Sequence, residues 1–146
     1  MELSELTARQ RAYFESGATR PLAARLAALR RLEEALGDWE GPIARALEED
    51  LGKPPFESWL CETGLVREEI RFLRRHLAGW MRPRRVPSPL ALFPGKSVIY
   101  PKPYGRVLIM APWNYPVQLC LSPLAGALAA GNCGVVKPSA YAPASS

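Results

Sequence analysis

Residues 105–137 read GRVLIMAPWNYPVQLCLSPLAGALAAGNCGVVK, and they contain two short apolar runs separated by a stretch rich in leucine and alanine. The runs at 107–110 and 134–137 are typical of strands buried on both faces, as in a parallel sheet. The stretch from 117 to 130 favours a helix, which Gly131 and Asn132 close. The segment therefore predicts a strand, a helix and a second, parallel strand joined by a right-handed crossover.

A sheet of two parallel strands is too small to form a domain by itself. It needs helices on both faces and neighbours at its edges, because unpaired edges leave backbone polar groups exposed. The residues that follow Lys137 are too few to supply them. We therefore expect an α/β fold that is incomplete in this chain.

The first 81 residues are expected to be helical. Leucines recur at steps of three and four on one stripe, at Leu22, Leu26, Leu29, Leu32 and Leu36. Charged residues between them are expected on the solvent side, namely Arg25, Arg30, Arg31, Glu33 and Glu34. Gly37 is expected to end this helix and Asp38 to help start the next, which Gly52 and two following prolines stop.

A long helix is then predicted from Phe56 to about Met81, where Pro83 ends it. Its apolar stripe comprises Phe56, Leu60, Val66, Ile70, Leu73, Leu77 and Trp80. The proline-rich residues 82–95 are expected to form an extended connector with a solvated arginine cluster, and 97–100 are β-rich. The chain thus divides into a helical region at 1–81, a connector with a bridging strand at 82–105, and an α/β part at 106–146.

Composition and charge exclude several classes of protein. The net charge is +5, but the arginines are spread along helices that also carry glutamates, so no nucleic-acid partner is expected. Three cysteines without CxxC spacing predict neither a disulfide framework nor a metal site. The charged start MELSELTARQ is not a signal peptide, and no apolar run is long enough to span a bilayer. We expect a cytoplasmic protein.

Polar side chains follow both predicted strands, at the edge where ligands of open α/β sheets bind. The side-chain amide of Asn114 could donate a hydrogen bond to an oxygen that becomes negative during a reaction. The local sequence favours a second interpretation, in which Asn114 caps the following helix. Lys137 could bind ribose hydroxyls or a phosphate, or simply extend from a strand end into solvent. Neither GxGxxG after the first strand nor a P-loop is present.

The motifs PYGRVLIMAPWNYP, SPLAGALAAGN and VVKPS come in the order and spacing of the aldehyde dehydrogenase superfamily, which residues 101–139 resemble closely. The stretches EEDLGKPPFESW and EEIRFLRRHLAGWMRPRRVPSPL look like the class 3 branch, which acts on medium-chain, aromatic and fatty aldehydes. The resemblance covers nearly the whole chain. It implies that 106–146 begin a Rossmann-like NAD(P)-binding domain and that the full-length protein is a homodimer, bridged in part through 97–100.

The resemblance also assigns roles to single residues. Asn114 matches the asparagine whose side-chain amide forms the oxyanion hole together with the backbone N–H of the nucleophile. Tyr115 matches an aromatic residue that lines the aldehyde channel. Trp113 and the backbone of Met110 and Ala111 match the floor of the NAD or NADP site, and Pro112 is assigned to the same site. Lys137 matches the lysine that reaches the adenosine ribose, and Ser139 lies beside it.

Two features depart from the resemblance. Many relatives carry a glutamate where this chain has Ala140, and its loss favours tolerance of NADP. The family's catalytic cysteine and general-base glutamate lie downstream of VVKPS, so Cys61, Cys120 and Cys133 are expected to be packing residues and the fragment to be inactive. The intact protein is expected to oxidise an aldehyde to a carboxylic acid through a cysteine thiohemiacetal. The alternatives are a non-catalytic truncated subunit or assembly piece, and a fragment of a semialdehyde dehydrogenase or acyl-CoA reductase.

Overall fold

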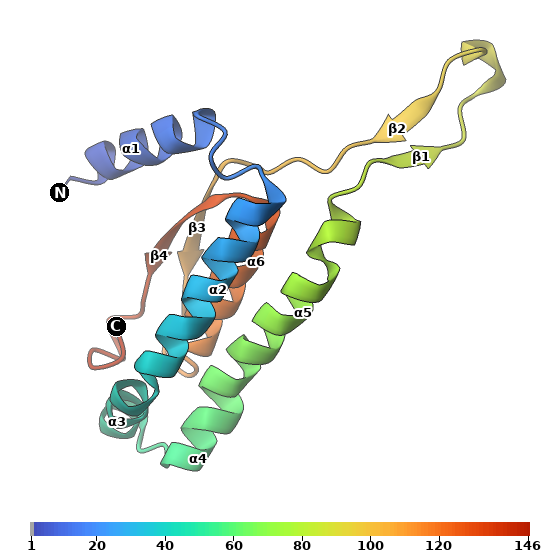
Figure 1. Ribbon diagram of the computed structural model, residues 1–146. Coiled ribbons are helices and arrows are strands. Elements are labelled where there is room, and N and C mark those ends of the chain that lie inside the picture. Colours follow the sequence, from blue (N-terminus) through green and yellow to red (C-terminus); the bar gives the residue numbers. More distant parts are fainter. Residues whose placement is uncertain (1) are drawn as a thin grey trace.

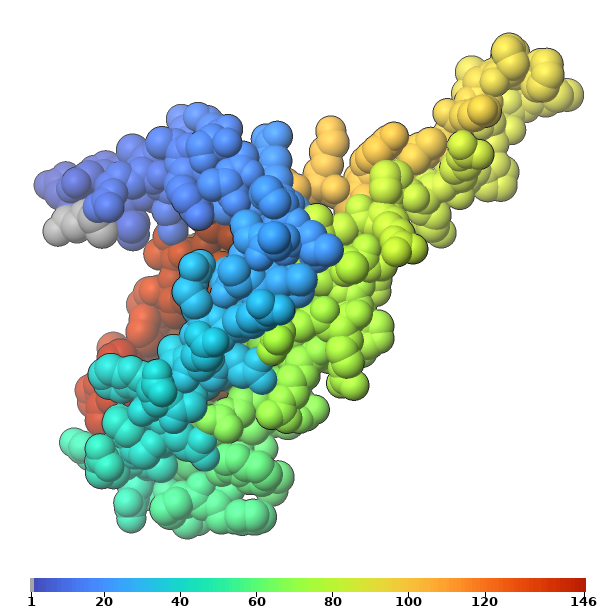
Figure 2. Space-filling model, in the orientation of Figure 1, coloured from blue at the N-terminus to red at the C-terminus, as the bar shows by residue number. Residues whose placement is uncertain are grey.

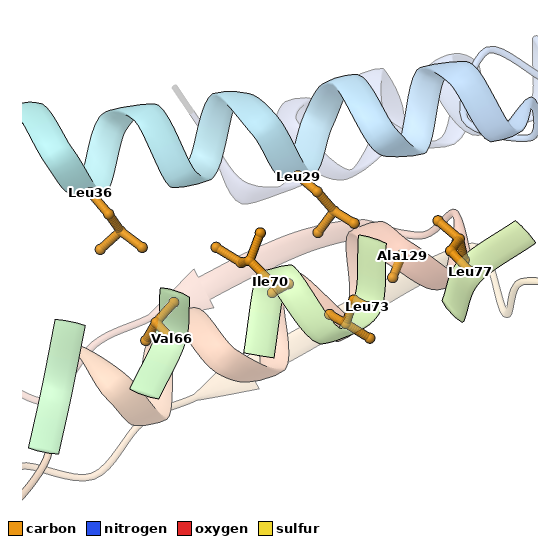
Figure 3. Close-up of a cluster of buried hydrophobic side chains, with 8 residues drawn as sticks. Leu29, Leu36, Val66, Ile70, Leu73, Leu77 and Ala129 are labelled. Atoms are coloured by element: carbon orange, nitrogen blue, oxygen red, sulfur yellow. The ribbon is translucent and has the colours of Figure 1, made fainter. Parts of the chain in front are cut away.

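Three helices meet in the main apolar core. Helices α2 (Leu22–Asp38) and α5 (Gly64–Trp80) lie side by side, and α6 (Gln118–Ala130) packs against both (Figures 1 and 3). The computed structural model describes residues 2–146. The buried side chains of this core are Leu29, Leu36, Val66, Ile70, Leu73, Leu77, Ala125 and Ala129. Burying a leucine or isoleucine contributes about 1.5–3 kcal/mol, so the predicted stripes of α2 and α5 hold the three helices together.

The predicted strand–helix–strand unit is confirmed. Strands β3 (Arg106–Met110) and β4 (Cys133–Lys137) are parallel neighbours, and α6 connects them. Gly131 closes α6 as expected, with a left-handed φ of +85°. Asn132 then accepts a hydrogen bond on Oδ1 from the backbone N–H of Gly105 at 2.8 Å, which joins the end of α6 to the start of β3.

The expectation that both faces of the first strand are buried is wrong for the described residues. Ile109 is buried, whereas Leu108 and Met110 are 62% and 72% exposed. Side chains alternate along a strand, so the face opposite Ile109 stays open because no element within 2–146 covers it.

Helix α1 (Leu3–Glu15) contacts the sheet through Gln10, whose Nε2 donates a hydrogen bond to the carbonyl oxygen of Gly134 at 2.9 Å.

The predicted boundary between the first two long helices is shifted. Helix α2 runs through Gly37 to Asp38, and Trp39 lies between it and α3 (Glu40–Leu51). A glycine ends a helix where it adopts a left-handed conformation, and Gly37 does not. Gly52 has a φ of +65° and ends α3 as expected.

Arg25 is buried, contrary to the expectation that it faces solvent. Its Nη1 donates to the carbonyl oxygen of Ala129 and its Nε to that of Thr19, both at 3.2 Å. The last carbonyls of a helix have no partner within the helix, and Arg25 supplies one for α6. Burial lowers the pKa of Arg25 from its ordinary value.

The predicted long helix is interrupted by a wide turn. It consists of α4 (Pro55–Ser58), the π-helical turn η1 (Trp59–Thr63) and α5. The extra residue of a π turn rotates the helix before the turn relative to the helix after it. Phe56 and Leu60, expected on the buried stripe, are therefore exposed, as is Trp80 at the far end, and the buried positions are taken by Ser58, Glu62 and Thr63.

An antiparallel arm projects from the helices (Figures 1 and 2). Strand β1 (Arg84–Val86) pairs with β2 (Ser97–Ile99), and the short 3-10 helix η2 (Leu90–Leu92) lies at its far end. The strand at 97–99 was expected, but the arginine cluster was expected in an extended connector rather than in its partner strand. Pairing with β2 supplies the hydrogen bonds that make this stretch a strand.

Replacing Gly131 by alanine should destabilise the fold. A Cβ there would lie 2.7 Å from Cζ of Arg25, and the left-handed backbone disfavours any side chain. The left-handed conformation alone costs about 1–2 kcal/mol, so we expect the free energy of unfolding to fall by about 2 kcal/mol. Denaturant titration measures it. The control is Gly79→Ala, on an exposed helical position where a Cβ meets nothing within 4 Å. Equal effects of the two substitutions would contradict the prediction.

Candidate active site

The ends of β3 and β4 meet at one edge of the sheet, as expected for parallel neighbours. Met110 lies opposite Lys137, and the N–H of Ala111 donates to the carbonyl oxygen of Lys137 at 3.1 Å. The segments that follow each strand therefore begin side by side. The residues proposed for one pocket leave the sheet at a common edge.

The predicted site residues differ in their exposure. Ala111 and Ser139 are buried, whereas the side chains of the others reach the surface: Met110, Pro112, Trp113, Asn114, Tyr115 and Lys137. The hydroxyl of Ser139 accepts a hydrogen bond from the N–H of Tyr141 at 3.2 Å, so it stabilises the turn after β4. Within residues 2–146, the ammonium group of Lys137 forms no ion pair.

The interpretation of Asn114 as a helix cap is wrong. The N-cap residue of α6 is Val117, three residues further on, and no capping hydrogen bond comes from its side chain. Within the described part of the chain, the amide of Asn114 makes no hydrogen bond to another residue. Its NH2 group is consequently free to donate to a ligand.

The first N–H groups of α6 are bound instead by a buried carboxylate from the π turn. Oε2 of Glu62 accepts hydrogen bonds from the N–H of Val117 at 3.1 Å and of Gln118 at 2.8 Å. Glu62 is fully buried. A negative charge at a helix N-terminus is favourable because the unpaired N–H groups there carry partial positive charge.

Lys53 neutralises this carboxylate and contacts the Asn114 segment as well. Its Nζ lies 2.6 Å from Oε1 of Glu62 and donates to the carbonyl oxygen of Asn114 at 2.8 Å. The same ammonium group lies 3.9 Å from the ring centre of Tyr115, which is cation–π distance. One buried ion pair thus contacts both ends of the segment 114–118.

Sequence reasoning missed both members of this pair. One signal was available: the predicted stripe jumps from Leu60 to Val66, a step of six residues that an α-helix does not use. That gap coincides with the π turn and with Glu62. Lys53 carries no comparable signal, because a lysine after a glycine that ends a helix is normally solvated.

The loop after β4 is tied back to α3. The carboxylate of Asp50 accepts hydrogen bonds from the N–H of Ala144 at 3.0 Å and from the N–H and hydroxyl of Ser145, both at 2.7 Å. Partial burial raises the pKa of Asp50, but these hydrogen bonds outweigh it and lower the pKa below its ordinary value. The contact orders the residues that follow Ser139.

Two of the three cysteines, Cys120 and Cys133, lack the features of a nucleophile. Cys120 and Cys133 are buried, and burial raises the pKa of both thiols; the negative charge of Glu62 adds to the rise at Cys120. Cys61 is half-buried on η1, so its packing role is partial. Among residues 2–146 no group of three or more histidine, cysteine or acidic side chains could hold a metal ion.

A parallel strand–helix–strand unit with exposed polar groups at its strand ends is characteristic of open α/β proteins. This chain belongs to the aldehyde dehydrogenase family, whose family model matches residues 2–146. The relatives named below are aldehyde dehydrogenases, which are oxidoreductases. No helix in the described part of the chain is long and apolar enough to cross a membrane.

Several relatives resemble the chain over most of its length. It is 42% identical to 4,4'-diaponeurosporen-aldehyde dehydrogenase of Staphylococcus aureus over 91% of the chain, and 44% identical to human aldehyde dehydrogenase family 3 member B1 over 94%. The structure of substrate-bound S. aureus AldH superposes with a TM-score of 0.94, at 40% identity and 99% coverage. The chain spans 29% of the length of the first two and 32% of the third.

A more distant solved structure is a NAD-dependent benzaldehyde dehydrogenase from Corynebacterium glutamicum. It is 27% identical to the chain and superposes with a TM-score of 0.77, over 92% of this chain and 28% of the other. The expected likeness to the class 3 branch is confirmed by the family 3 relatives.

Thiol modification should distinguish the three cysteines. Their exposure predicts that Cys61 reacts first with N-ethylmaleimide at pH 8, with Cys120 and Cys133 at least about tenfold slower because burial limits access and raises their pKa. Mass spectrometry of digested samples gives the rates. In denaturant all three should react alike, and a Cys120 that matches Cys61 in the folded state would contradict the assignment.

Proposed function

We propose that this chain is part of an NAD(P)-dependent aldehyde dehydrogenase that oxidises aldehydes to carboxylic acids. The observation that carries the proposal is the unpaired, exposed amide of Asn114 at the sheet edge where Lys137 also lies. We infer that residues 106–146 form the start of the dinucleotide-binding domain and that 1–81 and 82–105 form the helical region and the bridging segment.

Asn114 donates a hydrogen bond through its amide NH2 to the aldehyde oxygen. When a cysteine thiolate adds to the carbonyl carbon, the electron pair of the C=O bond moves to this oxygen, and the amide stabilises the negative charge. A nicotinamide cofactor held at the edge that carries Met110, Trp113 and Lys137 would serve as the two-electron acceptor and would take up the hydride from the carbon. Water hydrolyses the resulting thioester to the acid. Tyr115 lines the approach of the aldehyde.

A dinucleotide fits the groups at this edge. The ammonium of Lys137 is exposed and has no acidic partner within residues 2–146, so it is free to bind ribose hydroxyls. Met110, which lies opposite Lys137 in the sheet, presents exposed apolar surface, and so does Trp113, three residues further along the chain. The name of the C. glutamicum relative, a NAD-dependent enzyme, supports the same class of cofactor.

We further propose that the nucleophile and the general base are supplied from outside these 146 residues. The 146-residue chain alone would then have no aldehyde dehydrogenase activity. The raised pKa of Cys120 and Cys133 supports this.

The antiparallel arm formed by β1 and β2 exposes the apolar side chains of Leu90 and Phe93, which supports a bridging role of the arm in a homodimer. Unpaired cysteines support a reducing, cytoplasmic location. The names of two relatives, 4,4'-diaponeurosporen-aldehyde dehydrogenase and a benzaldehyde dehydrogenase, support an aldehyde as the substrate.

The test of this function is Asn114→Ala in the full-length protein that carries this chain. We expect kcat for aldehyde oxidation to fall by about 100- to 1,000-fold, the usual loss for one oxyanion donor, with little change in KM for NAD. NADH formation with a fatty and an aromatic aldehyde measures both constants. A wild-type protein without turnover, or an unchanged kcat in the variant, would refute the proposal.

Ala140 should influence the choice between NAD and NADP. It is exposed just after the segment that carries Lys137 and Ser139. A carboxylate at this position would accept hydrogen bonds from the ribose hydroxyls of NAD and would repel the 2′-phosphate of NADP. The substitution Ala140→Glu should therefore raise the ratio of kcat/KM for NAD to kcat/KM for NADP. The control Ala140→Gln has a similar size without the charge and should shift the ratio far less. An unchanged ratio in Ala140→Glu would rule this out.

A further inference from the structure

We propose that the buried pair Lys53–Glu62 is a positioning device that sets the direction of the Asn114 amide. This inference rests on the proposed role of Asn114 in aldehyde oxidation. Neither residue of the pair is required to touch the substrate. Both act through the backbone of the segment 114–118, which they hold at its two ends.

The hydrogen bonds of the pair account for each of its charged atoms. In Glu62, Oε1 binds Lys53, and Oε2 binds two N–H groups of α6. In Lys53, Nζ binds that carboxylate, the carbonyl oxygen of Asn114 and the ring face of Tyr115. Lys53 and Glu62 are 8% and 0% exposed. A buried network with its partners satisfied is rigid, since any displacement leaves a charge unpaired in a medium of low dielectric.

Helix capping alone does not explain this arrangement. If the helix had begun directly after Asn114, the carboxamide oxygen of Asn114 could have accepted hydrogen bonds from the first N–H groups, and the side chain would then be turned toward the helix. Glu62 occupies those donors, so the amide of Asn114 is left for another partner. Lys53 adds a bond to the carbonyl oxygen of Asn114, which contributes nothing to the cap but restrains the backbone from which the amide projects.

Stability alone does not explain it either. The desolvation of two buried charges offsets much of their attraction, and a well-packed apolar pair is often equally stable. The π turn is a further sign of a geometric requirement, because π turns are rare and here the turn rotates Glu62 onto the buried side. The charged pair provides a defined position for residues 114–118.

The experiment removes both charges together, so that neither is left buried alone. In the full-length protein, Lys53→Met/Glu62→Gln should keep a melting temperature close to that of the wild type while kcat falls by about 10- to 100-fold, since small misplacement of a catalytic group has losses of this order. KM for NAD should change little, because Lys137 is not held by the pair. Lys102→Met, on an exposed lysine, is the control and should leave kcat unchanged.

A double-mutant cycle with Asn114→Ala separates positioning from general damage. If the pair acts through the amide, the same two substitutions should lower kcat by less than about threefold once the amide is gone. Equal losses in the two backgrounds would overturn the proposal, and so would an unchanged kcat in the Lys53→Met/Glu62→Gln protein.

Hydrogen exchange keeps the inference separate from the proposed function. If the wild-type protein shows no turnover, the proposed function fails, but the amide exchange rates of Val117 and Gln118 still report on the segment. Faster exchange there in the Lys53→Met/Glu62→Gln protein, with the core of α5 still protected, supports a positioning role for the pair. Unchanged exchange would overturn it.

Discussion

The carboxylate of Glu62 bound to the N-terminus of α6 is the contact on which the architecture of the site depends. It joins the helical region to the strand–helix–strand unit at the point where the loop after β3 enters α6. Because the carboxylate is buried, it needs a cation, and Lys53 supplies it from the end of α3. The end of α3, the π turn and the distant start of α6 are thereby held around one charge pair, and the loop that carries Asn114 has its position set by them.

Helix α6 links this polar contact to the apolar core. One side of the helix packs on α2 and α5, where Leu29, Val66 and Ile70 are fully buried (Figure 3). It also packs against β3 and β4. Its first N–H groups are bound by Glu62, and a carbonyl near its end is bound by Arg25. Both ends of α6 are therefore satisfied by buried charged side chains from other elements, and a shift of the helix would break both contacts.

Sequence periodicity predicted most of the elements, but it predicted their buried faces only in part. Leu29 and Leu36 of α2 are buried as the pattern indicated, and so are Val66, Ile70, Leu73 and Leu77 of α5. The other leucines of the α2 stripe, Leu22, Leu26 and Leu32, are partly buried against the same core. The pattern failed at Phe56 and Leu60, because the π turn breaks the period of 3.6 on which it relies. It also failed for Leu108 and Met110, since an apolar run shows that a strand favours burial but not which faces are covered by the elements at hand.

The amino-acid sequence was enough to predict the helical first region, the strand–helix–strand unit, the family, and the helix ends at Gly52 and Gly131, because these depend on local backbone preferences and on motifs contiguous in the chain. Tertiary packing set the burial of Arg25, the pairing of Lys53 with Glu62, and the release of the Asn114 amide from capping. These contacts join residues 9 to 104 positions apart, and Glu62 reaches the start of α6 across 55 and 56 positions. Whether a charged side chain at such a distance finds its partner depends on how helices pack, which local propensity does not specify.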